Sequence, residues 1–170
     1  MDERTLIANT RIGTIPSLDR SFEISFELKL TSIQSKWQSV LRLTTTDKDV
    51  GVGSRIVAVK VNSQGKVLIA ADIDGVANVH RYSASSIPLN QWNRIKITQR
   101  LQPDSTYSFE ATLNDLAFFS KAEISDPQIW NNVDIYAADA FYSPATAKIK
   151  NLQVFRINSI PGLIYYPYTL

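Results

Sequence analysis

Two carboxylates, Glu23 and Glu27, are the residues that come nearest to an acid–base pair in this sequence. A retaining glycosidase holds two carboxyl groups about 5 Å apart. Glu23 and Glu27 share the polar face of an expected strand, which places their Cα atoms ~13 Å apart at about 3.3 Å per residue. That separation is too long for a retaining pair unless the strand bends, so we interpret both as solvent-facing and predict no catalytic residues. A hydrolase stays a remote alternative, because a sequence does not show which carboxylates meet in space.

Metal and nucleophile chemistry has few residues to draw on. His80 is the only histidine and the chain has no cysteine, which excludes disulfide bonds, thiolate nucleophiles and zinc sites with several His or Cys ligands. Aspartate is common at turns because its side chain bonds nearby backbone groups, but turn carboxylates also suit calcium. We predict that no cofactor is required, assign no metal ligands and leave calcium open. The acidic residues at apparent turns are Asp47, Asp49, Asp72, Asp74 and Asp139.

The segment Asp139–Tyr142 combines two kinds of group that suit a sugar. Sugar recognition needs an exposed aromatic ring against the C–H face of the sugar, with carboxylates or amides on its hydroxyls. Phe141 and Tyr142 supply rings, although aromatic residues near strand ends also pack inward as ordinary core residues. We predict that the side chains of Asp74, Asn78 and Asp139 form hydrogen bonds with sugar hydroxyls. The two aromatic rings are predicted to give apolar contact. The predicted ligand-binding residues are Asp74, Asn78, Asp139, Phe141, Tyr142 and Arg55.

Composition limits the class of protein. The 170 residues suit one domain, and 44% hydrophobic with 20% charged residues is typical of a globular chain. The net charge of +2 arises from scattered residues, so we predict no nucleic-acid partner. No apolar run approaches the ~18 residues that span a bilayer, and the first residues lack the apolar stretch of a signal peptide. We therefore expect no membrane insertion.

The elements that must position these residues read as strands. From Phe22 to Leu30, apolar and polar residues alternate without exception, which indicates a half-buried strand. Many short strands with few helix signals predict an all-β fold, an antiparallel two-sheet jelly-roll sandwich. Only Ser125–Trp130, with Pro127 in a first turn, predicts one turn of helix. The same alternation recurs in Ser39–Thr45, Ile56–Val61, Lys66–Ala71, Arg94–Gln99, Tyr107–Leu113, Val133–Tyr136 and Lys148–Ile157.

The end of the chain differs from the rest. Residues 159–170 contain three tyrosines, two prolines and no charged side chain. We therefore divide the chain into a domain at 1–158 and an apolar, tyrosine-rich segment at 159–170. Such a segment either packs along its own domain or docks on another chain, which would make a homo-oligomer.

Three stretches resemble laminin G-like domains of the concanavalin A-like lectin and glucanase fold, in particular a group of extracellular invertebrate modules. Ser86–Thr98 is similar to the "P-L-x-x-W-x-x-I-x-I" entry into a central strand, in which Trp92 is the packing residue and is expected to be buried. Lys66–His80 is similar to the strand, turn and strand that precede it, without the cysteines that members often carry at the positions of Ala70 and His80. Asn132–Leu152 resembles the closing block, with Ala140 and Phe141 in place of its Pro-Trp pair.

The likeness covers most of Thr14–Phe155, and the glucanase motif E-x-D-x-x-E is absent. The resemblance implies an extracellular or cell-surface module, concanavalin A-like and laminin G-like in fold, that binds glycans or protein partners and sometimes uses calcium. We expect a non-catalytic recognition module whose loops bind carbohydrate or glycosylated surfaces. The alternative is a structural or adhesion module that binds protein partners or itself through a sheet face, a strand edge or the C-terminal segment.

Overall fold

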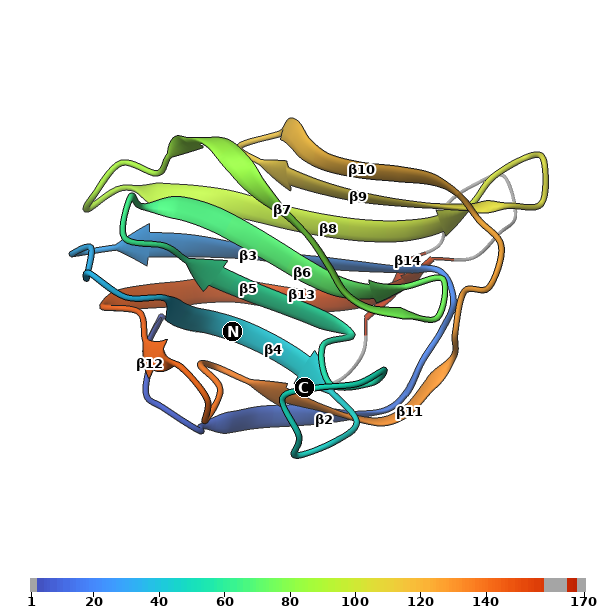
Figure 1. The fold of residues 1–170 in the computed structure, drawn as a ribbon, viewed down its shortest axis with the longest axis horizontal. Helices are drawn as coiled ribbons and strands as arrows, with labels where there is room; N and C mark the ends of the chain where they lie inside the picture. The colour runs from blue at the N-terminus through green and yellow to red at the C-terminus, as the bar shows by residue number, and fades with distance from the viewer. Residues whose placement is uncertain (1–2, 158–164, 168–170) are drawn as a thin grey trace.

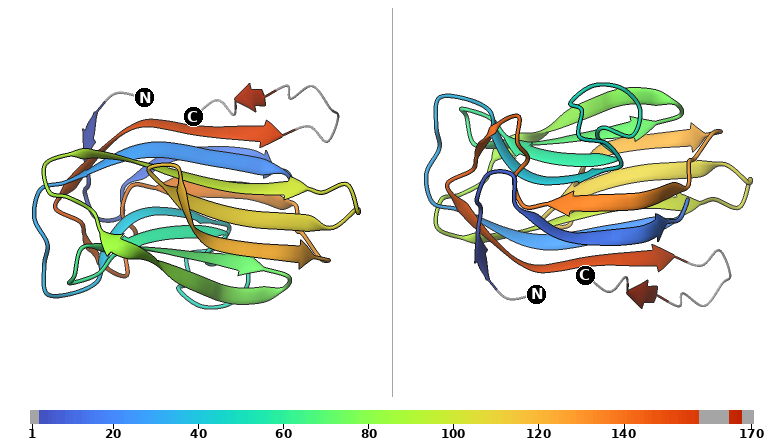
Figure 2. Two further views of the ribbon diagram at one scale, coloured as in Figure 1. Left: turned by 90° about the horizontal axis from the view of Figure 1, so that it is seen from above. Right: turned by 90° about the horizontal axis from the view of Figure 1, so that it is seen from below.

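The computed structural model of the chain describes residues 3–157 and the backbone of 165–167. These residues form two facing sheets, shown as two layers in Figures 1 and 2. Sheet A has the order β1 (Arg4–Thr5), β13 (Ala147–Ile157), β3 (Phe22–Leu30), β8 (Trp92–Leu101), β9 (Tyr107–Leu113) and β10 (Leu116–Ile124), and β14 (Tyr165–Pro167) pairs with β13. Sheet B has the order β2 (Arg11–Leu18), β11 (Trp130–Tyr136), β4 (Gln38–Thr44), β5 (Val57–Val61), β6 (Lys66–Ile73) and β7 (Val76–Ser86), and β12 (Ser143–Pro144) pairs with β4.

All of these pairings are antiparallel except the short contact between β12 and β4, so the predicted all-β jelly-roll sandwich is confirmed. Alternation places one face of each sheet in a shared core, because successive side chains of a strand point to opposite faces. Phe22, Phe26 and Phe109 are the largest of the most deeply buried side chains in this core. Phe109 contacts Phe119 with ring centroids 5.2 Å apart, so the core continues to the edge strand β10.

Alternation did not reveal three long strands, each of which is irregular or lies at an edge, although the family resemblance implied a strand at the start of one of them, β7. β2 contains Gly13 and Pro16, and β10 carries two register shifts against β9, so neither shows regular alternation. β7 is exposed at most of its positions and ends sheet B. Strict alternation requires one buried face and a continuous register. β7 lacks the buried face, and β2 and β10 lack the regularity.

The predicted helical turn at Ser125–Trp130 is wrong. Residues 126–129 are irregular, and Trp130 begins β11. The reason lies in the turn between β6 and β7, where the Asp74 carboxylate accepts hydrogen bonds from the N–H groups of Ser125 at 2.9 Å and Asp126 at 2.8 Å. These bonds hold the segment against the β6–β7 turn of sheet B, from which it runs directly into β11.

Most of the segment at 159–170 lies outside the described residues. Its described part, β14, pairs antiparallel with β13 of the same chain, with Arg156 opposite Tyr166. No helix in the part of the chain described here has the length and hydrophobicity that crossing a membrane requires.

Candidate functional site

The outer face of sheet B carries an unusual set of side chains. Val57, Val59 and Val61 point into the core, so Ala58 and Lys60 point outward. The register places Lys60 beside Leu68 on β6, and Leu68 beside Tyr82 on β7. A second row runs from Ala58 through Ala70 to His80. Ala58, Leu68 and Ala70 thus form a small, apolar centre on a face that a half-exposed sheet normally fills with polar groups.

These small residues form the floor of a depression with aromatic walls. Ala58, Leu68 and Ala70 make an apolar cluster separate from the main core, and Trp37 packs against it. The rings of Trp37 and Tyr82 lie 5.6 Å apart at an interplanar angle of 40°. Because alanine leaves space above the sheet, the rings stand higher than the floor between them.

A loop from the end of β11 forms another wall. Asp139 is 2% exposed, and its carboxylate accepts hydrogen bonds from the N–H groups of Phe141 and Tyr142, both at 3.0 Å. These bonds fix the turn that presents the two rings over neighbouring cations. Lys60 Nζ lies 3.3 Å from the centroid of the Tyr142 ring, and the guanidinium of Arg42 lies 4.7 Å from that of Phe141. Cations at these distances are attracted to the ring faces.

The loop between β4 and β5 delivers Arg55. Gly53 sits at φ +87°, and its N–H donates to Asp72 Oδ2 at 2.6 Å. The Arg42 Nε–H donates to the Ser54 carbonyl at 2.8 Å, so a strand side chain holds the loop from the other side. Arg55 Nη2 then pairs with Asp49 Oδ1 at 2.7 Å, inside the same loop.

Together these elements enclose a hollow of about 200 Å³, which we call the Lys60 hollow. Its volume is smaller than the ~300–1,000 Å³ of pockets for drug-sized ligands, so it suits a single small unit. Burial is the main cause that lowers the pKa of Lys60 to about 8, and the neighbouring Arg55 lowers it further. The hollow is lined by Trp37, Arg55, Lys60, Leu68, Asn78, His80, Tyr82 and Tyr142.

A second hollow of about 330 Å³, the Phe141 hollow, lies on the other side of the same loop. Desolvation lowers the pKa of Arg42 in its wall, while the nearby Asp139 opposes that change. The loop at Asp139–Tyr142 separates the two hollows, since Phe141 lines one and Tyr142 the other. The Phe141 hollow is lined by Asn9, Arg42, Thr44, Thr46, Asp47, Tyr136, Asp139, Ala140 and Phe141.

The structure brings together five of the six residues that the sequence suggested, in two groups. Arg55, Asn78 and Tyr142 line the Lys60 hollow. Asp139 and Phe141 line the Phe141 hollow. Asp74 lies apart from both, at the turn before β7, where its carboxylate accepts hydrogen bonds from Ser125 and Asp126. Their role in ligand binding stays a prediction.

Sequence reasoning missed Lys60, Trp37 and Tyr82. Lys60 follows the alternation of its strand, so the pattern indicated an ordinary solvated lysine. Its burial comes from the Asp139–Tyr142 loop, which is distant in sequence. Tyr82 lies on a strand that showed no clear alternation, and Trp37 borders a loop. The one available signal was the pair of alanines at outward positions, Ala58 and Ala70, where polar residues are usual.

The turn aspartates do not gather into a cation site. Among the described residues, no group of three or more His, Asp or Glu side chains could hold a metal ion. Asp72 accepts from Gly53 and from the Asn78 N–H, Asp49 pairs with Arg55, and Asp139 holds its own loop. These carboxylates therefore serve loop geometry, and the expectation that no cofactor is required, with calcium binding left open, stays a prediction.

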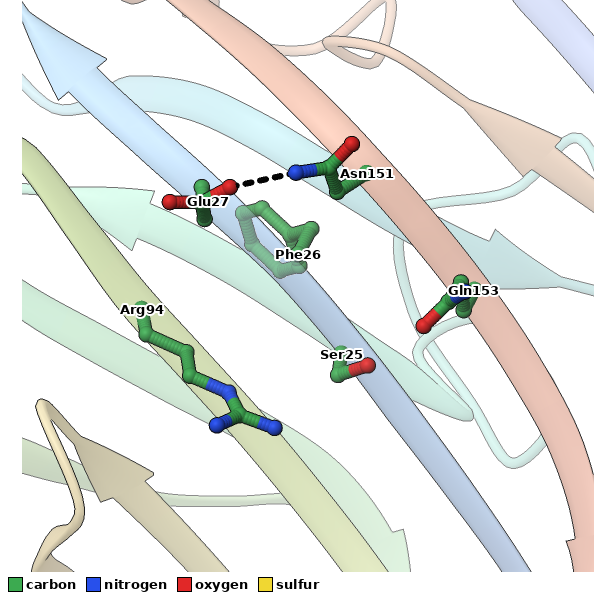
Figure 3. A pocket seen from close by; sticks show the side chains of 6 residues that line it. All are labelled: Ser25, Phe26, Glu27, Arg94, Asn151 and Gln153. Atoms are coloured by element: carbon green, nitrogen blue, oxygen red, sulfur yellow. Dashed lines mark hydrogen bonds between the residues drawn. The ribbon is translucent and has the colours of Figure 1, made fainter.

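A further hollow, of about 380 Å³, lies on the outer face of sheet A. Figure 3 shows its side chains on three neighbouring strands: Ser25 and Glu27 on β3, Arg94 on β8, Asn151 and Gln153 on β13. A register shift in β13 between Lys150 and Gln153 opens it, and Asn151 donates to Glu27 Oε2 at 2.5 Å. Glu27 is its only carboxylate, so the hollow lacks the paired carboxylates of a glycosidase.

Trp92 differs from the expectation that it is buried. It is only partly buried and lies on the outer face of sheet A, near the ammonium groups of Lys29 at 4.6 Å and Lys150 at 4.3 Å from the ring centroid. Its position opposite Lys29 in the register points it away from the core.

Solved structures with this architecture are numerous. A heptameric SAP-like pentraxin from Limulus polyphemus matches 89% of this chain and 74% of its own, with TM-score 0.62 and 10% identity. An endo-β-1,4-glucuronan lyase from Trichoderma reesei matches 89% and 78%, with TM-score 0.58 and 9% identity. A galectin from Caenorhabditis elegans matches 89% and 94%, with TM-score 0.51 and 13% identity.

The chain therefore has the concanavalin A-like jelly-roll fold, which occurs in binding proteins and in enzymes alike. No protein-family model matches the sequence, and no curated protein matches it either. Function has to be argued from the site.

Proposed function

We propose that this protein is a carbohydrate-recognition module that holds a sugar ring in the Lys60 hollow. The observation that carries the proposal is the apolar floor surrounded by aromatic rings from three separate elements. Trp37 precedes β4, Tyr82 lies on β7 and Tyr142 follows β11. A sugar offers C–H groups to such rings and hydroxyls to the polar groups between them.

Each wall has a role in this proposal. The tilted pair Trp37 and Tyr82 takes the apolar face of the ring, since both side chains are partly exposed. Asn78, exposed at the rim, donates and accepts hydrogen bonds with hydroxyls. Asp139 acts indirectly, because its carboxylate holds the Tyr142 loop in place.

We further propose a laminin G-like, extracellular module without catalytic activity. The resemblance of the three sequence blocks supports the assignment, and the single carboxylate of the sheet A hollow supports the absence of glycosidase chemistry. Incubation with labelled oligosaccharides tests the absence of catalytic activity. Any released sugar would favour the hydrolase alternative.

The test is a glycan array with the wild-type protein and two tryptophan variants. Trp37→Ala should weaken binding at least tenfold, because it removes the largest ring of the hollow. Trp92→Ala is the matched control, since it removes an equally large, partly exposed ring from the opposite sheet. Equal loss in both variants, or no glycan bound by the wild type, would refute the proposal.

Repeating the array with EDTA tests whether glycan binding requires calcium. Unchanged binding would show that it does not.

A second candidate function is adhesion or self-assembly through a protein interface. β7 ends sheet B and is mostly exposed, and the β4–β5 loop exposes Val50 and Val52 beside the site. An exposed edge strand offers unpaired backbone groups to another chain. Light scattering of the full chain and of a chain ending at Asn158 tests whether residues 159–170 mediate a homo-oligomer. A monomeric mass for both would exclude self-assembly.

A further inference from the structure

Lys60 is a buried cation, and no carboxylate in the described part of the chain forms an ion pair with it. Lys60 is 5% exposed, and its Nζ lies 3.3 Å from the centroid of the Tyr142 ring. A ring face replaces only part of the hydration that an ammonium group loses on burial. A lysine on the outer face of a strand can normally extend into water, so its retention under a loop needs a reason.

Arg55 gives an independent observation at the same hollow. It is 8% exposed, and its Nε is buried with no hydrogen-bond acceptor in the part of the chain described here. Asp49 Oδ1 forms an ion pair with Nη2. A guanidinium has five donors, and a buried donor without an acceptor costs about 1–3 kcal/mol. Two side chains of the hollow are therefore short of negatively charged or acceptor oxygens.

The local charges do not balance within the protein. The groups that act on Lys60 are the cations Arg55 and Arg42 and the carboxylates Asp139 and Asp49. With Lys60, the set has three positive and two negative charges. One of the carboxylates, Asp139, already accepts two backbone hydrogen bonds, and the other is paired with Arg55. An anionic group on a ligand would supply the negative charge that this set of side chains lacks.

We propose that the Lys60 hollow selects acidic sugars, whose carboxylate or sulfate group pairs with Lys60 and Arg55 while the ring lies against Trp37 and Tyr82. This inference rests on the proposed function and names its ligand class. A neutral sugar would leave the buried ammonium without compensation, whereas an anionic oxygen would form the charge-assisted bonds that both cations lack. The aromatic rings of the hollow would contact the sugar ring, and its two cations would pair with the acidic group.

The experiment is a glycan array that carries neutral glycans beside sialylated, uronic-acid-containing and sulfated ones, followed by solution affinities at pH 7. Each glycan that binds is compared with its counterpart that differs only in the acidic group. We expect the acidic member to bind at least tenfold more tightly in the wild type. Lys60→Met should abolish this preference, whereas Lys29→Met, which removes a lysine over the Trp92 ring on the other sheet, should keep it.

The outcomes separate the two proposals. Carboxylated and sulfated glycans form separate arms, and a preference for either supports the inference and identifies the group. Equal affinity for neutral and acidic members, with binding weakened by Trp37→Ala, would overturn the acidic-sugar inference and leave the proposed function intact. An acidic preference that survives in Lys60→Met would also overturn it. Sodium acetate or sodium sulfate binding as tightly as the acidic glycans would overturn it too, since no sugar ring would then be recognised.

Discussion

Lys60 illustrates how one outward residue becomes buried. Its neighbours along the strand, Val59 and Val61, are core residues, and the lysine faces away from them. The Tyr142 ring then closes over the ammonium group at 3.3 Å. The resulting loss of hydration lowers the Lys60 pKa to about 8 from 10.5. A site residue of this kind favours ligand binding at the expense of the stability of the free protein.

Lys60→Met should therefore stabilise the free protein at pH 7, by about 1–3 kcal/mol, because an apolar side chain of similar length replaces an uncompensated charge. The pH dependence has a defined sign. The unfolded state keeps its proton up to about pH 10.5 and the folded state releases it near pH 8, so the wild type gains stability as the pH rises between these values. The advantage of the variant should be full below pH 8 and vanish by about pH 10.5. Urea unfolding across this range measures it.

Other charged or titratable groups near Lys60 are present in both proteins, so the difference between them isolates the lysine. Lys29→Met serves as the control, and its unfolding free energy should stay within about 0.5 kcal/mol of wild type because Lys29 is partly exposed. A variant at Lys60 that is less stable than wild type at pH 7 would mean that the ammonium has a partner. The shared groups are Arg42, Asp49, Arg55, His80, Asp139 and Tyr142.

Among the elements, the β4–β5 loop depends on two glycines with different surroundings. Gly51 has φ +95° with open space around it, whereas a Cβ on Gly53, at φ +87°, would lie 2.6 Å from Thr45 Oγ1. Gly51→Ala should cost about 1–3 kcal/mol from backbone strain alone. Gly53→Ala should cost about 1 kcal/mol more, because it adds a clash to the same strain. Thermal unfolding of both variants compares them directly.

The same pair tests whether the loop positions Arg55. Gly53 lies two residues before Arg55, and its N–H donates a hydrogen bond to Asp72. A displacement of Gly53 therefore moves the Arg55 guanidinium. Glycan affinity should fall in Gly53→Ala more than in Gly51→Ala when both are measured well below their melting temperatures. The reverse order would show that the tip of the loop, rather than its base, contacts the ligand.

At this scale the sequence is informative where the pattern is local. Phe22–Leu30 and Tyr107–Leu113 agree with β3 and β9 at both ends, because alternation and turn residues lie within each segment. The helical turn at Ser125–Trp130 failed, because Asp74 bonds its backbone from a distant turn. Most of the predicted ligand residues lie in loops, with Asn78 on β7 as the exception. Lys60 and Tyr82 lie on strands and become neighbours only through the register of sheet B.

The whole molecule is a sandwich in which the chain crosses between the two sheets, and the site depends on one such crossing. β10 belongs to sheet A, and the chain then crosses to β11 in sheet B, whose end leads to the Asp139–Tyr142 loop. The crossing therefore helps to decide where the loop lies. Sequence patterns predicted the two sheets, but the order of strands that unites β4, β5, β6 and β7 under this loop is a long-range property.

Asp74 anchors the crossing, and its replacement should show how strongly the two layers depend on it. The N–H groups of Asp126 and Ser125 hold the pKa of this carboxylate below its usual 3.8. Asp74→Ala removes three acceptor contacts and should cost about 1–2 kcal/mol at pH 7. Because a lowered aspartate pKa adds stability above the unfolded value, the difference from wild type should shrink as the pH falls through the lower folded pKa.

Asp104→Ala is the control, since Asp104 accepts hydrogen bonds from Thr106 within its own turn. The melting temperature of this variant should change less than that of Asp74→Ala. Equal shifts in both variants would show that the crossing does not rely on Asp74.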